Sequence, residues 1–266
     1  MQKVFLVTGA NKGIGKEICH QLAKSCPKST IILTSRSIEN GTKTLKEFEN
    51  FKNIEFHQLD VEDKESIKQL SKFISEKYSK IDVLINNAGF MSMATLDEEI
   101  AKKTLGINYF GLKNVTLEIL PLLNKNGRVV NISSGLGEIG NFYSEEIKEK
   151  IFNEDKSIEE IDELCEIFLK SVKEDKIKEN GWRNSAYSVS KAMVNKLTRV
   201  LKNLYFSDER NLIFNACCPG WVKTDMGGPN AMRNVQQGSE TPVWLSIEEN
   251  LNENGKFFRD KKLISF

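Results

Sequence analysis

The sequence has 266 residues, 39% of them hydrophobic and 28% charged, and a net charge of +1 at pH 7. This composition is typical of a globular protein with one large α/β domain or two small ones, and its near-neutral charge argues against general electrostatic binding of nucleic acid or an anionic membrane. The first apolar run is too short for a signal peptide or a membrane span, and the five cysteines lack metal-site spacing, so we expect a cytoplasmic protein without a bound metal.

A strand, a glycine-rich turn and a helix are predicted at the start of the chain. Residues 4–8 form a short apolar run typical of a buried parallel strand, and T-G-A-N-K-G-I-G follows at 8–15. Residues 16–24 then show the apolar spacing of a helix. Glycines in this context let the backbone approach a phosphate, while the helix N-terminus offers unpaired N–H groups. We therefore predict a dinucleotide site whose diphosphate cradle contains Gly9, Asn11, Lys12, Gly13, Ile14 and Gly15.

The end of the second predicted strand, at residues 30–34, indicates which cofactor binds. Sites that prefer NAD usually place an acidic residue here to bind the adenosine ribose. This sequence has Arg36 instead, with Lys12 in the glycine-rich turn, and two cations suit a ribose 2′-phosphate. We therefore predict NADPH or NADP+ as the cofactor. The alternative is that Arg36 is a solvated surface residue, partly neutralised by Glu39.

Strands and helices continue to alternate in the first half of the chain. Residues 54–59 predict a third strand that ends at Asp60 and Val61, a polar and an apolar residue suited to an adenine amino group and ring. A helix is predicted over 66–78 and a fourth strand over 82–86. Small residues that leave room for a ligand follow that strand: Asn87, Ala88 and Gly89. The alternation predicts a single Rossmann-like domain over residues 1–266, with a doubly wound parallel sheet of about seven strands and helices on both faces.

The second half continues the pattern with one interruption. Residues 96–123 have a mostly helical pattern that includes Asn108, and a fifth strand over 127–134 ends at Ser134. Residues 138–181 then form a charged insertion whose apolar residues are spaced as in two amphipathic helices. The remaining elements are predicted to be a helix at 185–205, a strand at 212–218, a loop at 219–226, a short helix at 241–247 and a strand at 256–258.

Tyr187 and Lys191 stand four positions apart in the predicted helix over 185–205, so their side chains share one helix face. An ammonium group close to the phenol would favour its ionised form and lower a pKa that is normally about 10. A lowered pKa suits a proton donor that works at neutral pH. A Tyr-x-x-x-Lys pattern alone occurs by chance in most proteins of this size, so the prediction depends on the other motifs.

Five motifs follow one another along the chain: T-G-A-N-K-G-I-G at 8–15, N-N-A-G at 86–89, N-I-S-S at 131–134, Y-S-V-S-K at 187–191 and P-G-W-V-K-T-D-M at 219–226. In this order they resemble the short-chain dehydrogenase/reductase family over essentially the whole chain. Within the family, the chain is most similar to the monomeric NADPH-dependent carbonyl reductases. H-Q-L-D at 57–60 and the wide separation of Ser134 from Tyr187 carry that resemblance.

The resemblance implies a role for each motif. Tyr187 would protonate a carbonyl oxygen as hydride arrives from the nicotinamide, and Lys191 would lower the pKa of the phenol. Ser134 would hold the developing oxyanion, and Asn108 would complete a proton relay. Further cofactor contacts would come from Asp60, Val61, Asn87, Ala88, Gly89, Tyr187, Lys191, Pro219, Gly220, Val222 and Thr224, and the substrate pocket from Ser134, Leu136 and Trp221. The inserted helices would cover the face that other members use for oligomer contacts, which implies a monomer.

Three functions remain open at this point. The first is NADPH-dependent reduction of small carbonyl compounds, namely quinones, aldehydes and ketones, to alcohols or hydroquinones. The second is a short-chain dehydrogenase for one specific alcohol or steroid, and the third is a non-catalytic NADP-binding sensor. A sensor needs no proton donor, so the complete set of Asn108, Ser134, Tyr187 and Lys191 favours an enzyme. Choosing between the two enzymes from the fold alone would be an analogy.

Overall fold

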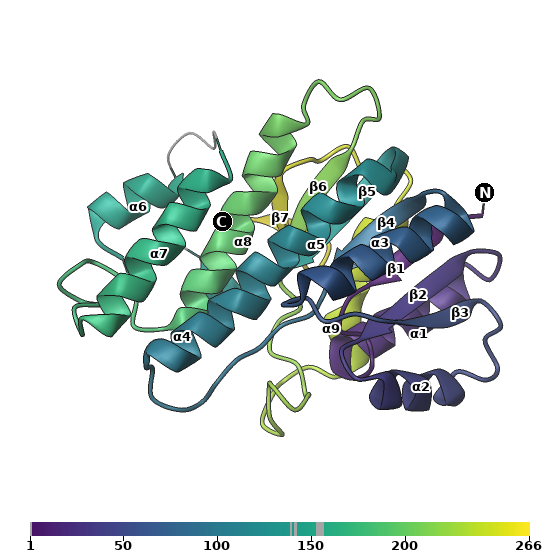
Figure 1. The fold of residues 1–266 in the computed structure, drawn as a ribbon, viewed down its shortest axis with the longest axis horizontal. Coiled ribbons are helices and arrows are strands. Elements are labelled where there is room, and N and C mark those ends of the chain that lie inside the picture. The colour runs from purple at the N-terminus through teal and green to yellow at the C-terminus, as the bar shows by residue number, and fades with distance from the viewer. Residues whose placement is uncertain (1, 139, 141–142, 153–156) are drawn as a thin grey trace.

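Eight strands form one sheet in the computed structural model, which describes residues 2–138, 140, 143–152 and 157–266 (Figure 1). The strands are β1 (Val4–Val7), β2 (Thr30–Ser35), β3 (Ile54–Gln58), β4 (Ile81–Asn86), β5 (Leu123–Ile132), β6 (Ile213–Cys217), β7 (Lys256–Arg259) and β8 (Lys262–Ile264). Their order is β3-β2-β1-β4-β5-β6-β7-β8, and all neighbours are parallel except β7 and β8. The predicted doubly wound sheet is therefore confirmed. The strand order reverses between β1 and β4, which is where such sheets bind ligands, beyond the carboxyl ends of the strands.

The strand β8 has no counterpart among the predicted elements. It pairs antiparallel with β7 through a tight hairpin turn at Asp260 and Lys261, whose φ angles are 53° and 59°. Positive φ at both turn residues matches the twist of a two-residue hairpin, but such turns usually contain glycine. Because neither residue is glycine, the hairpin lacks the usual sequence signature.

Helices cover both faces of the sheet (Figure 1). One face carries α1 (Gly13–Ser25), α2 (Ile38–Glu47) and α9 (Val235–Ile247). The other carries α3 (Lys64–Tyr78), α4 (Glu98–Leu105), α5 (Leu112–Ile119) and α8 (Ala186–Leu204), flanked by α6 (Glu145–Phe152) and α7 (Glu159–Lys173). None of the described helices combines the length and the apolar character needed to cross a bilayer.

Side chains along each strand alternate between the two cores, because successive strand residues point to opposite faces. Leu6, Leu84 and Val129 pack in the core that contains α3, α5 and α8. Phe5 and Val83 pack in the opposite core, against α1 and α9. Both faces of the central strands are therefore buried, which explains their nearly continuous apolar sequences.

The helix predicted over 96–123 is not regular. α4 ends at Leu105, the six residues Gly106–Gly111 form a π-helical turn, and α5 continues from Leu112. A short 3-10 turn then leads into β5 at Leu123, so this strand begins earlier than predicted. The π-turn contains Asn108, and wide turns of this kind often occur at functional sites.

α9 is longer than the helix predicted over 241–247. Pro242 favours a helix start, because proline is tolerated in the first helical turn. The observed helix begins at Val235 instead and contains Pro242 in its interior. Asn234 and Gln237 form a reciprocal capping box, in which each side chain accepts a hydrogen bond from the other's backbone N–H.

The predicted insertion over 138–181 contains α6 and α7, in the positions expected for two amphipathic helices. The buried side of α7 includes Ile161, Leu164 and Phe168, and this helix packs against α4 and α8. The parts of the insertion at 139, 141–142 and 153–156 lie outside the described residues.

Candidate active site

The carboxyl ends of β1 and β4 bring two of the predicted motifs together. The Thr8 hydroxyl oxygen accepts hydrogen bonds from the backbone N–H groups of Asn87 and Ala88, each at 2.9 Å. The Asn87 carboxamide donates to the carbonyl oxygens of Thr8 and Gly9, at 2.9 and 3.0 Å. Asn87 therefore braces the glycine-rich turn. Thr8, which was not among the predicted site residues, supplies the reciprocal hydrogen bonds.

Three glycines of the turn leave no space for a side chain. Gly9 has a φ of 60°, and a Cβ atom there would lie 2.8 Å from the Cα atom of Ala88. A Cβ on Gly15 would lie 2.7 Å from the carbonyl oxygen of Gly9. Gly13 has a φ of 56°, and its Cβ position lies 3.2 Å from the Thr224 methyl carbon. The turn therefore needs glycine for both its conformation and its close packing.

The other predicted turn residues connect the cradle to its surroundings. The Asn11 carbonyl accepts a hydrogen bond from Thr44 of α2 at 2.7 Å. The Ile14 carbonyl accepts one from Ser239 of α9 at 3.3 Å. The helices α2 and α9 therefore hold the backbone of the turn in place.

The N-terminus of α1 differs from those of several neighbouring helices. Lys12 stands at its N-cap without a side-chain capping bond, and the first turn of α1 contains no acidic residue. The N-caps of α2, α3, α4 and α8 do accept backbone hydrogen bonds through their side chains: Ser37, Asp63, Asp97 and Ser185. Uncapped N–H groups and the helix dipole of α1 fit an anion, so a dinucleotide diphosphate suits this cradle.

The two predicted phosphate-binding cations have different surroundings. Arg36 is exposed just beyond β2, and its guanidinium has no hydrogen-bond or ion-pair partner among the residues that the structure describes. Lys12 instead forms an exposed ion pair of 2.6 Å with Asp225. A phosphate group at Lys12 would therefore compete with the Asp225 carboxylate, whereas Arg36 is available.

Asp60 and Val61 follow β3 at the same edge of the sheet. The Asp60 backbone N–H donates to the Ser66 hydroxyl at 2.9 Å, and the Asp60 carboxylate accepts from the Glu62 backbone at 3.1 Å. Val61 is buried and packs against the π-turn, where a Cβ on Gly111 would lie 2.8 Å from a Val61 methyl carbon. The predicted adenine-binding pair is thus fixed to the element that contains Asn108.

Asn108 is fully buried, and its carboxamide has protein partners on both ends. The carboxamide N–H groups donate to the Phe90 carbonyl at 2.9 Å and to the Ser190 hydroxyl at 3.0 Å. Its oxygen accepts from the Phe90 backbone N–H at 2.7 Å, and Ser190 donates onward to the Tyr187 carbonyl at 2.7 Å. Asn108 therefore connects the loop after β4 to α8. Ser190, which was not predicted as a site residue, is the link.

Tyr187 and Lys191 lie near the start of α8, next to Ser134. The Lys191 ammonium is buried, lies 5.7 Å from the centre of the Tyr187 ring and donates to the Ile132 carbonyl at 2.7 Å. Ser134 caps the short 3-10 turn Gly135–Gly137, and an interaction of its side chain with the Tyr187 phenol lowers the pKa of that phenol. The predicted residues of this trio are therefore neighbours.

The protonation states differ from the expectation. Burial raises the pKa of Tyr187 to about 12, and the hydrogen bond with Ser134 only partly opposes this effect. Burial also lowers the pKa of Lys191 to about 8, despite an opposing effect of Cys217 and Cys218. The expected net lowering of the tyrosine pKa is not found in this structure, because desolvation dominates and the Lys191 ammonium is directed at the Ile132 carbonyl. At neutral pH the phenol therefore retains its proton.

The loop after β6 completes this edge of the sheet. It contains the predicted residues Pro219, Gly220, Val222 and Thr224. Gly220 has a φ of 81°, and Val222 pairs with Arg233 in an isolated parallel bridge. The Thr224 methyl group lies close to Gly13, as described above, so the loop borders the diphosphate cradle.

Two predicted substrate-binding residues follow neighbouring strands. Leu136 lies beyond β5, and Trp221 lies beyond β6. Their exposed fractions are 47% and 55%, and the Trp221 indole N–H donates to the Gly227 carbonyl at 2.7 Å. Both are therefore placed where an apolar ligand could contact them.

A buried polar ladder beneath the site was not predicted. Asn86 of β4 donates to Thr116 of α5 at 2.8 Å and to Asn131 of β5 at 2.9 Å. Asn131 donates in turn to Thr198 of α8 at 2.9 Å. The ladder fixes α5 and α8 to the sheet. Asparagine inside an otherwise apolar strand is the signal that could have found it, because a buried carboxamide needs partners.

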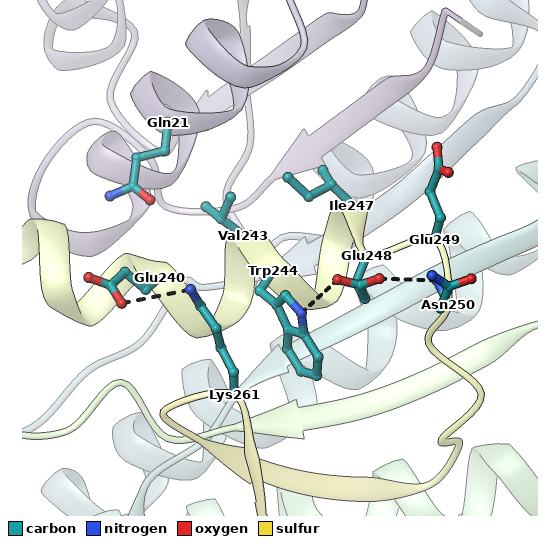
Figure 2. A pocket seen from close by; sticks show the side chains of 9 residues that line it. All are labelled: Gln21, Glu240, Val243, Trp244, Ile247, Glu248, Glu249, Asn250 and Lys261. Atoms are coloured by element: carbon teal, nitrogen blue, oxygen red, sulfur yellow. Dashed lines mark hydrogen bonds and ion pairs between the residues drawn. The ribbon is translucent and has the colours of Figure 1, made fainter.

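A groove of about 520 Å³ lies on a different part of the molecule (Figure 2). Its lining includes Gln21 of α1, Trp244 of α9 and Lys261 of the β7–β8 turn. The Trp244 indole N–H donates to Glu248 at 3.0 Å, and Lys261 pairs with Glu240 at 3.9 Å. None of the predicted site residues lines this groove, so it does not extend the candidate site.

The chain is similar to known proteins along almost its whole length. The family model described as "short chain dehydrogenase" matches residues 3–144. Carbonyl reductase [NADPH] 1 of Sus scrofa is 37% identical over 99% of this chain and 94% of its own length. Short-chain dehydrogenase/reductase 1 of Saponaria officinalis is also 37% identical, over 100% of this chain and 96% of its own. The structure of salutaridine reductase from Papaver somniferum superimposes with a TM-score of 0.88 and 32% identity, covering 97% of this chain and 100% of that one. The chain therefore belongs to the short-chain dehydrogenase family.

Proposed function

We propose that this protein is an NADPH-dependent carbonyl reductase that converts quinones, aldehydes and ketones into hydroquinones or alcohols. The observation that carries the proposal is the placement of Ser134 beside the protonated Tyr187 phenol, with the Lys191 ammonium on the same helix face. The similarity to the Sus scrofa protein named carbonyl reductase [NADPH] 1 supports the cofactor and the reaction class.

The cofactor is proposed to bind across the edge from β3 to β6. The uncapped N-terminus of α1 and the glycine-rich turn would hold the diphosphate, and Arg36 would bind the 2′-phosphate. Asp60 and Val61 would contact the adenine. The loops at Asn87–Gly89 and Pro219–Thr224 would border the nicotinamide half.

When bound, NADPH supplies a hydride to the carbonyl carbon. Ser134 would donate a hydrogen bond to the carbonyl oxygen, and Tyr187 would transfer its phenolic proton to that oxygen. The hydride and the proton together convert the carbonyl group into an alcohol. Lys191 would stabilise the remaining phenolate until solvent returns the proton, and Asn108 would hold the helix that carries both residues. Leu136 and Trp221 would contact apolar parts of the substrate.

The second candidate is reduction of one specific ketone rather than a broad set. The structural similarity to salutaridine reductase of Papaver somniferum favours it, since that protein is named for a single substrate. An enzyme for one defined alcohol or steroid would use the same proton donor. The number of accepted substrates separates the two candidates.

The first test is the loss of NADPH absorbance in the presence of a panel of quinones, aldehydes and ketones, repeated with NADH. Tyr187→Phe is the control, and we expect it to bind NADPH while turnover falls about 10²- to 10⁴-fold, the usual contribution of a positioned general acid. Turnover of several panel members supports the broad reductase, and turnover of one supports the second candidate. Tight NADPH binding without turnover of any carbonyl would favour the sensor.

We further propose that the protein is a cytoplasmic monomer. All five cysteines are unpaired, as suits a reducing compartment. The insertion helices α6 and α7 cover the outer side of α8 and α4, so these helices are not left open for a second subunit. Light scattering at several protein concentrations would measure the mass, and a stable dimer would contradict the proposal.

A further inference from the structure

The π-turn Gly106–Gly111 touches several parts of the proposed site at once. Asn108 joins it to Phe90, just beyond N-N-A-G, and to Ser190 on α8, as described above. Gly111 packs on Val61 beyond β3. A wide turn of this kind is less regular than an α-helix, so its shape depends on the contacts that surround it.

The neighbouring residue Tyr109 connects the same turn to the insertion. Its side chain is fully buried, and its hydroxyl donates to one carboxylate oxygen of Asp162 on α7 at 2.8 Å. Lys113 of α5 donates to the other oxygen at 2.6 Å, and the Lys113 side chain is only 12% exposed. Asp162 thus binds one residue within the π-turn and one residue just after it.

Tyr109 keeps its phenolic proton across the working pH range. Burial raises the pKa of the Tyr109 phenol far above its ordinary value, so the phenol remains a donor. Lys113 also lies near the rings of Tyr109 and Phe110, at 5.8 and 5.1 Å from their centres, and these cation–π contacts help to hold the ammonium beside Asp162. A charge-assisted hydrogen bond in a shielded place is stronger than a neutral one.

We propose that Asp162 is a positioning residue for the reaction: by holding Tyr109 and Lys113, it fixes the π-turn and so the Asn108 bridge between the loop after β4 and α8. The insertion then contributes to catalysis although it supplies no reacting group. This inference rests on the proposed function, because the element it fixes supports Tyr187. The connection runs from Asp162 through Tyr109 and Asn108 to Ser190, which bonds to the Tyr187 backbone.

The kinetic test compares Asp162→Ala, Asp162→Asn and Tyr109→Phe with the matched control Glu163→Gln, an exposed carboxylate on the same helix. Enzyme concentration is normalised by NADPH-binding stoichiometry. We expect Asp162→Ala to lower kcat about 10- to 100-fold with little change in KM, because small displacements of reacting groups cost this much. Asp162→Asn keeps an acceptor for Tyr109 and should retain more activity, while Glu163→Gln should match the wild type. Tyr109→Phe added to Asp162→Ala should lower kcat no further.

Amide hydrogen exchange provides a readout that does not need turnover. Peptides covering 89–95 and 104–112 should exchange faster in Asp162→Ala than in Glu163→Gln or the wild type. If the wild type reduces no carbonyl, the proposed function fails, and exchange at these two peptides still decides whether Asp162 controls the turn. If Asp162→Ala does not fold, the same kinetic and exchange measurements are made on Asp162→Asn and Tyr109→Phe.

Two results would overturn the inference. One is an Asp162→Ala enzyme that melts at a lower temperature but keeps the wild-type kcat per cofactor-binding site, which would make the contact a stabilising one alone. The other is unchanged exchange at both 104–112 and 89–95, which would show that neither the π-turn nor the loop bonded to Asn108 depends on Asp162.

Discussion

Replacing Lys191 by methionine should change how stability depends on pH. The folded protein lowers the pKa of Lys191 from 10.5 to about 8, chiefly by burial. Since one pKa unit corresponds to about 1.36 kcal/mol, burying this charge costs at most about 3.4 kcal/mol relative to the unfolded chain. Because the folded-state pKa is the lower one, the unfolded chain binds more protons between pH 8 and 10.5, and the contribution of Lys191 to stability rises with pH across that window.

The difference between wild type and Lys191→Met isolates this effect, because other titrating groups occur in both proteins. Integrating the two titration curves predicts that the wild type gains about 2.5 kcal/mol relative to the variant between pH 7 and pH 10. The lost hydrogen bond to the Ile132 carbonyl changes the unfolding free energy of the variant by the same amount at every pH. It therefore leaves the pH dependence of the difference from wild type unchanged.

Urea unfolding followed by tryptophan fluorescence, with a reductant and without cofactor, gives both unfolding free energies at pH 7, 8, 9 and 10. Lys202→Met, a change at a lysine on the same helix outside the candidate site, is the control for the loss of a lysine from this helix. A wild-type minus Lys191→Met difference that stays constant from pH 7 to pH 10 would refute the argument from burial.

Three further predictions concern cofactor binding, and NADPH fluorescence titration measures each of them. Arg36→Asp should weaken NADPH binding at least about tenfold and improve NADH binding, because a carboxylate repels the 2′-phosphate and accepts from a ribose; equal selectivity would mark Arg36 as a surface charge. Gly15→Ala should abolish cofactor binding or destabilise the protein, since its Cβ would overlap the turn and the Asn87 side chain; normal binding would contradict the close packing. Asp225→Asn should strengthen NADPH binding up to about fivefold at low salt, because it releases Lys12 from an exposed ion pair, and the gain should disappear at high salt.

Local features of the sequence were sufficient for much of the fold. Short apolar runs separated by helical spacing predicted the doubly wound sheet, and the T-G-A-N-K-G-I-G motif predicted the tight turn between β1 and α1. These features succeed because strand and helix periods are encoded in neighbouring residues. The misses, such as β8 and the start of α9, occur where a turn lacks its usual residues or where proline suggests a false start.

The sequence by itself determined the alternation of strands and helices, the glycine-rich turn and the shared face of Tyr187 and Lys191, because all of these follow from spacing along the chain. Only the tertiary structure decided how deeply Tyr187 and Lys191 are buried and, as a result, their pKa values. Burial raises the tyrosine pKa and lowers the lysine pKa, an outcome that depends on the solvent excluded by distant segments. Contacts such as Lys12 with Asp225 and Tyr109 with Asp162 join residues far apart in the chain, and periodicity carries no information about such pairs.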